Sequence, residues 1–173
     1  MKHKLFFGIA ALAAAFTLSA QNPSQNLIPN GNFAELSKQK IGEQEVMFPK
    51  NWELYGNTQD WKIVKTEKGN EIYTKGVLTI GIAVPKDQPE GSFYNLVIRA
   101  KGKGKIGIRT WSWEGYNPRT NHRRLEDLPK YDLTETYKDY TFRIPYLPKE
   151  YYLIIYIDGD DKTIENVSCI IGK

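Results

Sequence analysis

The sequence predicts an all-β fold built as a two-sheet antiparallel β-sandwich. Three observations support this prediction. Short segments rich in β-branched and aromatic residues recur along residues 21–173, turn residues separate them, and no stretch has the apolar spacing of a helix. Many short strands at fairly regular spacing, without intervening helices, are typical of two antiparallel sheets packed face to face.

The first twenty residues have the features of a secretory signal peptide. Lys2 and Lys4 precede an apolar, alanine-rich run, and Ala20 is a small residue of the kind found before a cleavage site. The run is too short for a comfortable membrane span and no second one follows, so we expect removal rather than a retained membrane anchor. The sequence therefore predicts a signal peptide at 1–20 and an exported single domain at 21–173, either periplasmic or extracellular.

Length and charge limit the classes of partner. Removal of the leader leaves 153 residues, and a domain of this size buries about 68% of the surface of its unfolded chain. Lys2 and Lys4 are lost with the leader, so 24 basic side chains become 22 against 20 acidic ones, a net charge of +2. Nucleic-acid-binding domains normally carry a larger basic surplus, and we expect no nucleic-acid partner.

Cysteine and histidine are scarce. Cys169 is the only cysteine, so no intramolecular disulfide forms, and a core of this size does not need one. Cys169 alternates with Val167 and Ile171, which favours a small buried hydrophobic residue over a reactive thiol. His122 is the only histidine after export, which excludes a histidine-rich zinc site.

The strands are expected between clusters of Gly, Pro, Asn and Asp. The expected strands, in chain order, are 61–65, 72–74, 77–84, 92–100, 105–113, 138–144, 151–157 and 164–171. Most of them alternate apolar and polar residues, and Leu96 and Ile98, for example, alternate with Arg99 on the other face. The segment 151–157 is apolar on both faces, which indicates a central strand.

Residues 114–136 do not fit this pattern. They have little periodicity and carry two prolines and three arginines. A structureless segment of this length inside a compact domain is often a functional loop. The alternative is a solvated connection with a turn of helix at 123–128.

Several segments, in this order, resemble a known family. The opening segment 26–33 (Asn-Leu-Ile-Pro-Asn-Gly-Asn-Phe) and the closing segment 164–168 (Ile-Glu-Asn-Val-Ser) are similar to its first and last strands. Pro-Lys-Asn-Trp at 49–52, the tyrosine-to-Ala-Lys-Gly strand at 94–102 and the strand at 137–142 resemble its internal elements. The family is that of the galactose-binding-like jelly rolls, which include carbohydrate-binding modules such as those of families 4 and 9. The resemblance implies an all-β, two-sheet antiparallel jelly-roll β-sandwich, a fold that hosts sugar binding, adhesion and structural roles.

The resemblance also implies a structural calcium ion where the first and last strands meet. The corresponding positions here are Ala34, followed by Glu35, and Glu165, so the side chains depart from the family pattern. Calcium needs six to eight oxygen ligands, some of which backbone carbonyls would supply. Glu35 and Glu165 are the candidate metal ligands, and no other cofactor is expected. The acidic turn 158–161 is either a second cation loop or an ordinary turn between strands.

One strand carries the residues best suited to bind a sugar. Arg109, Trp111 and Trp113 share one face of the strand 105–113, opposite Ile106 and Ile108. Flat aromatic rings match the C–H face of a sugar ring, and planar polar groups bond its hydroxyls. Asn95 and Arg99 are expected on the same face of a neighbouring strand, with Tyr116 just past the strand end. The predicted ligand-binding residues are therefore Arg109, Trp111, Trp113, Tyr116, Asn95 and Arg99.

The opposing interpretation is that these tryptophans are core residues. A single bulge would turn Trp111 and Trp113 inward. Trp52 and Trp61 are expected to pack in the core or at an edge. Tyr152 and Tyr156 could extend the binding surface, but we interpret them as packing residues of a central strand.

A basic segment is a second candidate binding site. Arg119, His122, Arg123 and Arg124 have the forked donors that bind a carboxylate or sulfate on an acidic polysaccharide. The alternative is a solvated charge run paired with nearby acidic residues.

Catalysis has little support in the sequence. A Ser-His-Asp or Cys-His arrangement would depend on His122 alone, and a glycosidase needs two carboxylates, of which Glu114 beside the tryptophans is the best single candidate. The sequence thus predicts a non-catalytic module that binds a polysaccharide or other glycan. The other hypotheses are an adhesive or structural module with an envelope-protein partner, and a small glycan-active enzyme.

Overall fold

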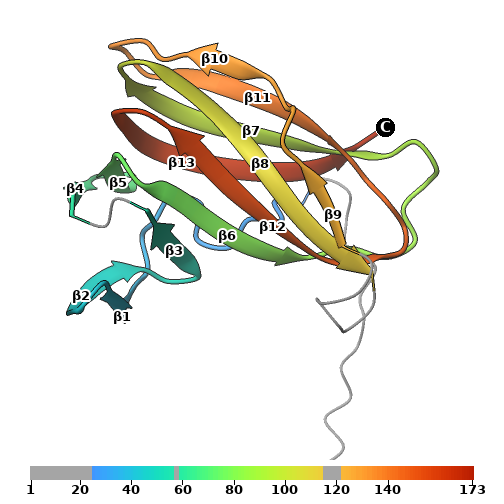
Figure 1. Cartoon of the computed structure of the whole chain (residues 1–173), viewed down its shortest axis with the longest axis horizontal. Coiled ribbons are helices and arrows are strands. Elements are labelled where there is room, and N and C mark those ends of the chain that lie inside the picture. Colours follow the sequence, from blue (N-terminus) through green and yellow to red (C-terminus); the bar gives the residue numbers. More distant parts are fainter. Residues whose placement is uncertain (1–24, 57–58, 115–121) are drawn as a thin grey trace, which may run out of the picture.

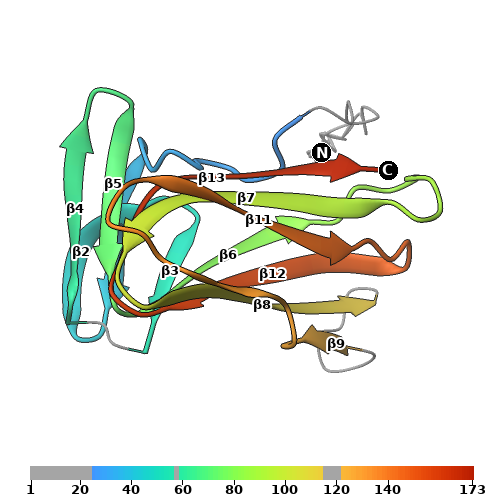
Figure 2. The ribbon, with the colours of Figure 1, turned by 90° about the horizontal axis from the view of Figure 1, so that it is seen from above.

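The structure, a computed structural model, describes residues 25–56, 59–114 and 122–173. These residues form strands and turns without a helix, and the strands build a two-sheet antiparallel jelly-roll β-sandwich (Figures 1 and 2). The predicted fold class is confirmed. No helix long and apolar enough to cross a membrane is present in this part of the chain.

One layer is a six-stranded sheet with β12 (Glu150–Gly159) at its centre. β8 (Lys105–Glu114) pairs with one edge of β12, and β6 (Val77–Ala83) pairs with the other. β3 (Trp52–Tyr55) lies beyond β6. The central position predicted for the segment 151–157 is confirmed, because β12 has a partner strand on both edges.

The second layer is a five-stranded sheet that faces the first across the core (Figure 2). In order across the sheet its strands are β11 (Lys138–Pro145), β7 (Phe93–Gly102), β13 (Lys162–Gly172), β5 (Gly69–Thr74) and β4 (Trp61–Thr66). A separate two-stranded ribbon is formed by β1 (Leu36–Ile41) and β2 (Gln44–Pro49) and lies beside β3 in Figure 1.

All the predicted strand ranges are found, with ends shifted by at most three residues. The alternation within them also holds: Leu96, Ile98, Ile106 and Ile108 are buried between the sheets. The strands β1, β2 and β3 were not expected, because their short sequences mix charged and apolar residues without a long regular alternation.

Cys169 lies on the inner face of β13 and is fully buried. Burial raises the pKa of its thiol to about 12, so the group stays protonated at neutral pH and behaves as a small apolar residue. The interpretation of Cys169 as a buried hydrophobic residue is confirmed.

The opening segment 26–33 is not the regular strand that the resemblance implies. It runs along β13, where the Leu27 amide donates to the Cys169 carbonyl (2.7 Å) and the Val167 amide donates to the Gly31 carbonyl (2.9 Å). Phe33 has a left-handed φ of 56°, and Asn30 has one of 54°. These two turns of the backbone interrupt an extended strand, so only isolated ladder bonds remain.

The expectation of a structureless or partly helical loop at 114–136 is wrong for the part that the structure describes. β9 (His122–Leu125) and β10 (Lys130–Asp132) both pair with the free edge of β8. Short strands with little burial of their own lack the long alternation that sequence reading requires. Residues 115–121, which include Tyr116 and Arg119, lie outside the described residues.

Lys162, at the start of β13, is a fully buried cation. Its ammonium group donates to the carbonyls of Gly76 (2.7 Å) and Gly159 (3.2 Å). Burial lowers the pKa of Lys162 to about 8, against the attraction of the aspartates in the turn 158–161. The turn thus has internal partners: the Lys162 ammonium donates to the Gly159 carbonyl, and Asp160 accepts a hydrogen bond from the Lys105 backbone amide (3.0 Å).

Candidate functional site

The outer face of the six-stranded sheet carries the candidate site. In β8 the side chains of Ile106, Ile108, Thr110 and Ser112 are buried, whereas Arg109, Trp111 and Trp113 point away from the core and are exposed or half-buried. β8 pairs with β12 without a register shift from Ile106 to Trp113. The predicted register is therefore confirmed, and the bulge that would turn the two indoles inward is absent from this part of β8.

Cross-strand pairing arranges the outward residues in rows that run across the sheet. The rows are Glu53, Thr79, Tyr156 and Arg109; Gly81, Ile154, Trp111 and Arg124; and Ala83, Tyr152 and Trp113. Aromatic side chains from β8 and β12 thus lie side by side, and β3 and β6 add polar and small residues next to them.

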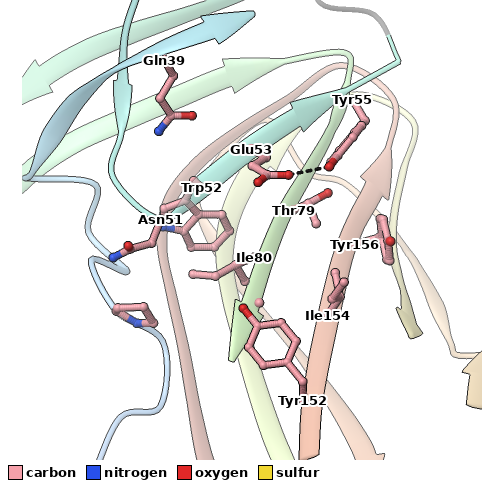
Figure 3. A pocket seen from close by; sticks show the side chains of 12 residues that line it. Gln39, Asn51, Trp52, Glu53, Tyr55, Thr79, Ile80, Tyr152, Ile154 and Tyr156 are labelled. Atoms are coloured by element: carbon pink, nitrogen blue, oxygen red, sulfur yellow. Dashed lines mark hydrogen bonds between the residues drawn. The ribbon is translucent and has the colours of Figure 1, made fainter. Parts of the chain in front are cut away.

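A groove of about 840 Å³ lies over β3, β6 and β12 (Figure 3). Residues of β1 and of the segments before β1 and β3 form its wall. It is lined by Pro29, Gln39, Asn51, Trp52, Glu53, Tyr55, Thr79, Ile80, Gly81, Tyr152, Ile154 and Tyr156. The groove is therefore continuous with the face that carries Trp111 and Trp113, since Ile154 pairs with Trp111 and Tyr152 with Trp113.

Gly81 creates the space in which the Tyr152 ring lies. A Cβ atom at Gly81 would overlap the Tyr152 hydroxyl and the adjoining ring carbons. The ring therefore lies close to the β6 backbone, toward Ile80 in Figure 3. Because Gly81 has no side chain, the Tyr152 ring can lie against the β6 backbone and line the groove.

The other end of the groove is polar. Tyr55 donates a hydrogen bond to the Glu53 carboxylate, and this bond and burial raise the pKa of Tyr55 to about 12. Beside this pair lies Thr79, which is 5% exposed and whose hydroxyl oxygen is buried without a hydrogen-bond partner among the described residues. Thr79 lines the groove, but its hydroxyl oxygen is covered by protein atoms.

Ring contacts hold the aromatic end together. The Trp113 and Tyr152 rings are 5.2 Å apart between centroids, and Trp111 meets Trp113 edge to face at 6.4 Å. The Arg124 guanidinium lies 4.9 Å from the centre of the Trp111 ring. Such contacts restrict the rings to defined orientations, so the surface is preformed.

Comparison with known proteins bears on this arrangement. No protein-family model and no curated protein matches the sequence. Solved structures do match the fold. The xylan-binding family 22 module CBM22-1 of Paenibacillus barcinonensis Xyn10C superposes with a TM-score of 0.57 at 9% identity, over 86% of this chain and 96% of that one. The chain has a carbohydrate-binding-module jelly-roll fold.

Two further solved structures share the jelly-roll fold of this chain. The CBM22-1-GH10 portion of Clostridium thermocellum xylanase 10B, solved with xylohexaose, gives a TM-score of 0.55 at 8% identity, over 87% of this chain and 29% of that one. The enzymatically active domain of tailspike protein 4 of bacteriophage CBA120 gives a TM-score of 0.50 at 17% identity, over 87% of this chain and 22% of that one. At these identities the likeness concerns the fold.

In this jelly roll, the expectation that Asn95 and Arg99 adjoin the tryptophans is wrong. Both residues lie on β7, which belongs to the five-stranded sheet and not to the sheet of β8. Arg99 is engaged there by Glu165 and by Asp139 (3.2 Å). Of the predicted surface, the structure brings together Arg109, Trp111 and Trp113, and Tyr116 lies outside the described residues.

Arg109 is also less free than the sequence indicates. It donates two hydrogen bonds to the Asp158 carboxylate, and its guanidinium lies 5.4 Å from the centre of the Tyr156 ring. These bonds to Asp158 raise the pKa of Arg109. Asp158 thus neutralises Arg109 locally, and the arginine orients Tyr156 as well as contributing its own edge to the surface.

Sequence reasoning missed the residues that line the groove. Tyr152 and Tyr156 were interpreted as packing residues, yet both face outward and are half-buried. The spacing Tyr-x-Ile-x-Tyr in β12 is the signal that indicates one shared face. The expectations for the other tryptophans are confirmed: Trp52 is fully buried against Phe33, and Trp61 packs edge to face on Phe48.

The side chains proposed for calcium have other partners. Glu35 pairs with Lys50 (3.2 Å), and Glu165 pairs with Arg99 and Lys68. The described residues contain no group of three or more His, Cys, Asp or Glu side chains that would hold a metal ion. Calcium binding by Glu35 and Glu165 stays a prediction.

The basic segment and the catalytic candidate are placed as follows. Arg123 faces the interior and pairs with Glu150 (2.7 Å), and Arg124 lies on Trp111. Glu114 is exposed at the end of β8 opposite Glu150, which is buried, and neither of them lines the groove. Glu53 is the one carboxylate among the described lining residues, so they offer no pair of carboxylates for glycoside hydrolysis.

Proposed function

We propose that this chain is an exported, non-catalytic module that binds a glycan on the outer face of its six-stranded sheet. The observation that carries the proposal is the groove over β3, β6 and β12, whose aromatic floor continues into Trp111 and Trp113. The fold shared with carbohydrate-binding modules supports it.

The chemistry of the groove suits a sugar chain. A pyranose ring has apolar C–H faces and a rim of hydroxyls, so it needs flat rings on one side and hydrogen-bonding groups at the edge. Tyr152 and Trp113 supply adjacent rings, and Glu53 and Tyr55 supply the polar edge. The volume of about 840 Å³ lies within the range of about 300–1,000 Å³ typical of ligand sites.

The charges favour an uncharged glycan. Glu53 is the single charged side chain among the described residues that line the groove, and it would repel a uronic acid or a sulfate. Arg109 is neutralised by Asp158, and Arg123 by Glu150. Of the cations expected to hold an acidic polysaccharide, Arg123 is thus committed to Glu150, and Arg124 lies on the Trp111 ring. Arg119 lies outside the described residues.

Alanine substitution tests the assignment. Tyr152→Ala and Trp113→Ala are each expected to weaken binding by about tenfold or more, since a fully covered aromatic side chain is worth about 1.5–3 kcal/mol. Affinity electrophoresis against a panel of neutral and acidic polysaccharides measures the loss. Tyr73→Ala, a half-buried tyrosine of β5 in the other sheet, is the matched control and should bind like the wild type.

Two outcomes would reject the proposal at different levels. Normal retention of both groove variants would reject the assigned surface. A wild-type protein that is retained by no polysaccharide, but that captures one specific envelope protein, would support the adhesive alternative. The enzyme hypothesis predicts product release from the same panel, lost in Glu114→Gln.

A further inference from the structure

Two consecutive arginines of β9 lie on opposite sides of the six-stranded sheet. Arg123 pairs in register with Ser112, whose side chain is buried, and Arg124 pairs with Trp111, whose side chain faces outward. Successive side chains of a strand alternate between faces. One arginine is therefore placed beneath the sheet, where a cation is costly, and the other on the candidate binding surface.

The inner arginine has a buried counterion. Glu150, at the start of β12, is 2% exposed, and one oxygen of its carboxylate accepts a hydrogen bond from Ser112 and pairs with the Arg123 guanidinium at 2.7 Å. Arg123 also donates to the Pro145 carbonyl at 3.1 Å. A register shift in the pairing of β12 with β8 occurs between Glu150 and Tyr152, so Glu150 faces inward while Tyr152 faces outward.

This ion pair is a poor source of stability. The second carboxylate oxygen of Glu150 and the Nε atom of Arg123 are buried without a hydrogen-bond partner among the described residues. Burying a pair of charges costs about as much as their attraction returns, and incomplete hydrogen bonding worsens the balance. The best-attested role of such a pair is to select one arrangement of the chain over another.

The competing arrangement here is a slip of β9 by one residue. β9 is a four-residue edge strand, and a slip of one residue exchanges its two faces. Arg124 would then turn inward and Arg123 outward. Leu125 favours the observed register because it packs against the core, but the two arginines are chemically identical, so only their surroundings distinguish their positions.

We infer that Glu150 sets the register of β9 by binding Arg123, and that it thereby holds Arg124 against Trp111. The part that concerns ligand binding rests on the proposed function, because Arg124 adds planar donors to the glycan surface. Glu150 is in this sense a positioning residue: it is buried, does not line the groove and acts through β9.

The test compares Glu150→Gln with Glu114→Gln. Cross-strand nuclear Overhauser effects report whether Ser112 still lies opposite Arg123, a readout that needs no ligand. Glu150→Gln should weaken these contacts or shift them by one residue, and should lower the affinity for the retained polysaccharide about three- to tenfold, as expected for one displaced cation–aromatic contact. Glu114→Gln, which neutralises the exposed residue opposite Glu150, should change neither.

A rescue variant separates register from simple destabilisation. Arg123→Leu combined with Glu150→Gln removes both buried charges and leaves Arg124 as the single arginine of β9. The apolar side chains at 123 and 125 then set the register of β9 by themselves. This double variant should fold, pair as the wild type does and recover the affinity. It also carries the test if Glu150→Gln alone does not fold.

The inference is overturned if Glu150→Gln keeps wild-type cross-strand contacts, or if the double variant folds without them. A wild-type protein that binds no polysaccharide would reject the proposed function instead, and the register would still be read from the same contacts.

Discussion

Gly81→Val is expected to abolish glycan binding while the sandwich stays folded. The new side chain would occupy the place of the Tyr152 hydroxyl and drive that ring out of the groove. Valine is favoured in strands, and the backbone of Gly81 is not among those with a positive φ, so the backbone accepts it. Losing the floor and one stacking ring together should lower the affinity at least about 100-fold, or about 2.7 kcal/mol.

Calorimetric titration with the retained polysaccharide measures the loss, and thermal unfolding checks the fold. Ser168→Val adds the same kind of bulk to the outer face of β13 in the other sheet and is the matched control. Unchanged affinity in Gly81→Val would mean that the groove is not used, whatever the rest of the face does.

The second large effect concerns stability and pH. Lys162 keeps its proton up to about pH 10.5 in the unfolded chain and only up to about 8 in the folded one. Unfolding therefore takes up a proton at Lys162 between these pH values, and the contribution of Lys162 to the free energy of unfolding rises with pH across that range. The shift corresponds to a rise of up to about 3 kcal/mol.

Lys162→Met keeps the length of the side chain and removes the charge, so the difference in the free energy of unfolding between the wild type and this variant should change with pH by this amount. Urea denaturation of both proteins from pH 8 to 10 provides the comparison. Lys138→Met, on an exposed position of β11, should keep the wild-type slope. If the free energy of unfolding varies with pH in the same way for the wild type and Lys162→Met, the account of Lys162 as a buried group with a lowered pKa is contradicted.

The alternation of apolar and polar residues along a strand predicted most of the correct features. Alternation alone placed Ile106 and Ile108 inside and Trp111 and Trp113 outside, because the inward residues of β8 are aliphatic or small and the register has no bulge there. The same reasoning failed where one strand is apolar on both faces. In β12 it did not distinguish Tyr152, which lines the groove, from Leu153, which is buried.

The pairing of strands that are distant in the sequence could not be predicted from the alternation of side chains. β7 and β8 are joined by a Gly-containing turn of the kind that closes a hairpin, yet they lie in different sheets. Periodicity reports which side chains face the core but not which sheet holds the strand. Asn95 and Arg99 were therefore assigned to the wrong surface. The groove likewise depends on β3, β6 and β12, which meet only in the fold.

The most direct test of the glycan surface is the intrinsic fluorescence of the tryptophans during titration with a polysaccharide. Trp111 and Trp113 border the groove and are half-buried. Trp52 also lines the groove but is 0% exposed, and Trp61 packs on Phe48 and is not among the lining residues. The wild type should show a saturable change in emission that Trp111→Phe/Trp113→Phe lacks. No change with any polysaccharide, or an equal change in that double variant, would contradict binding at this face.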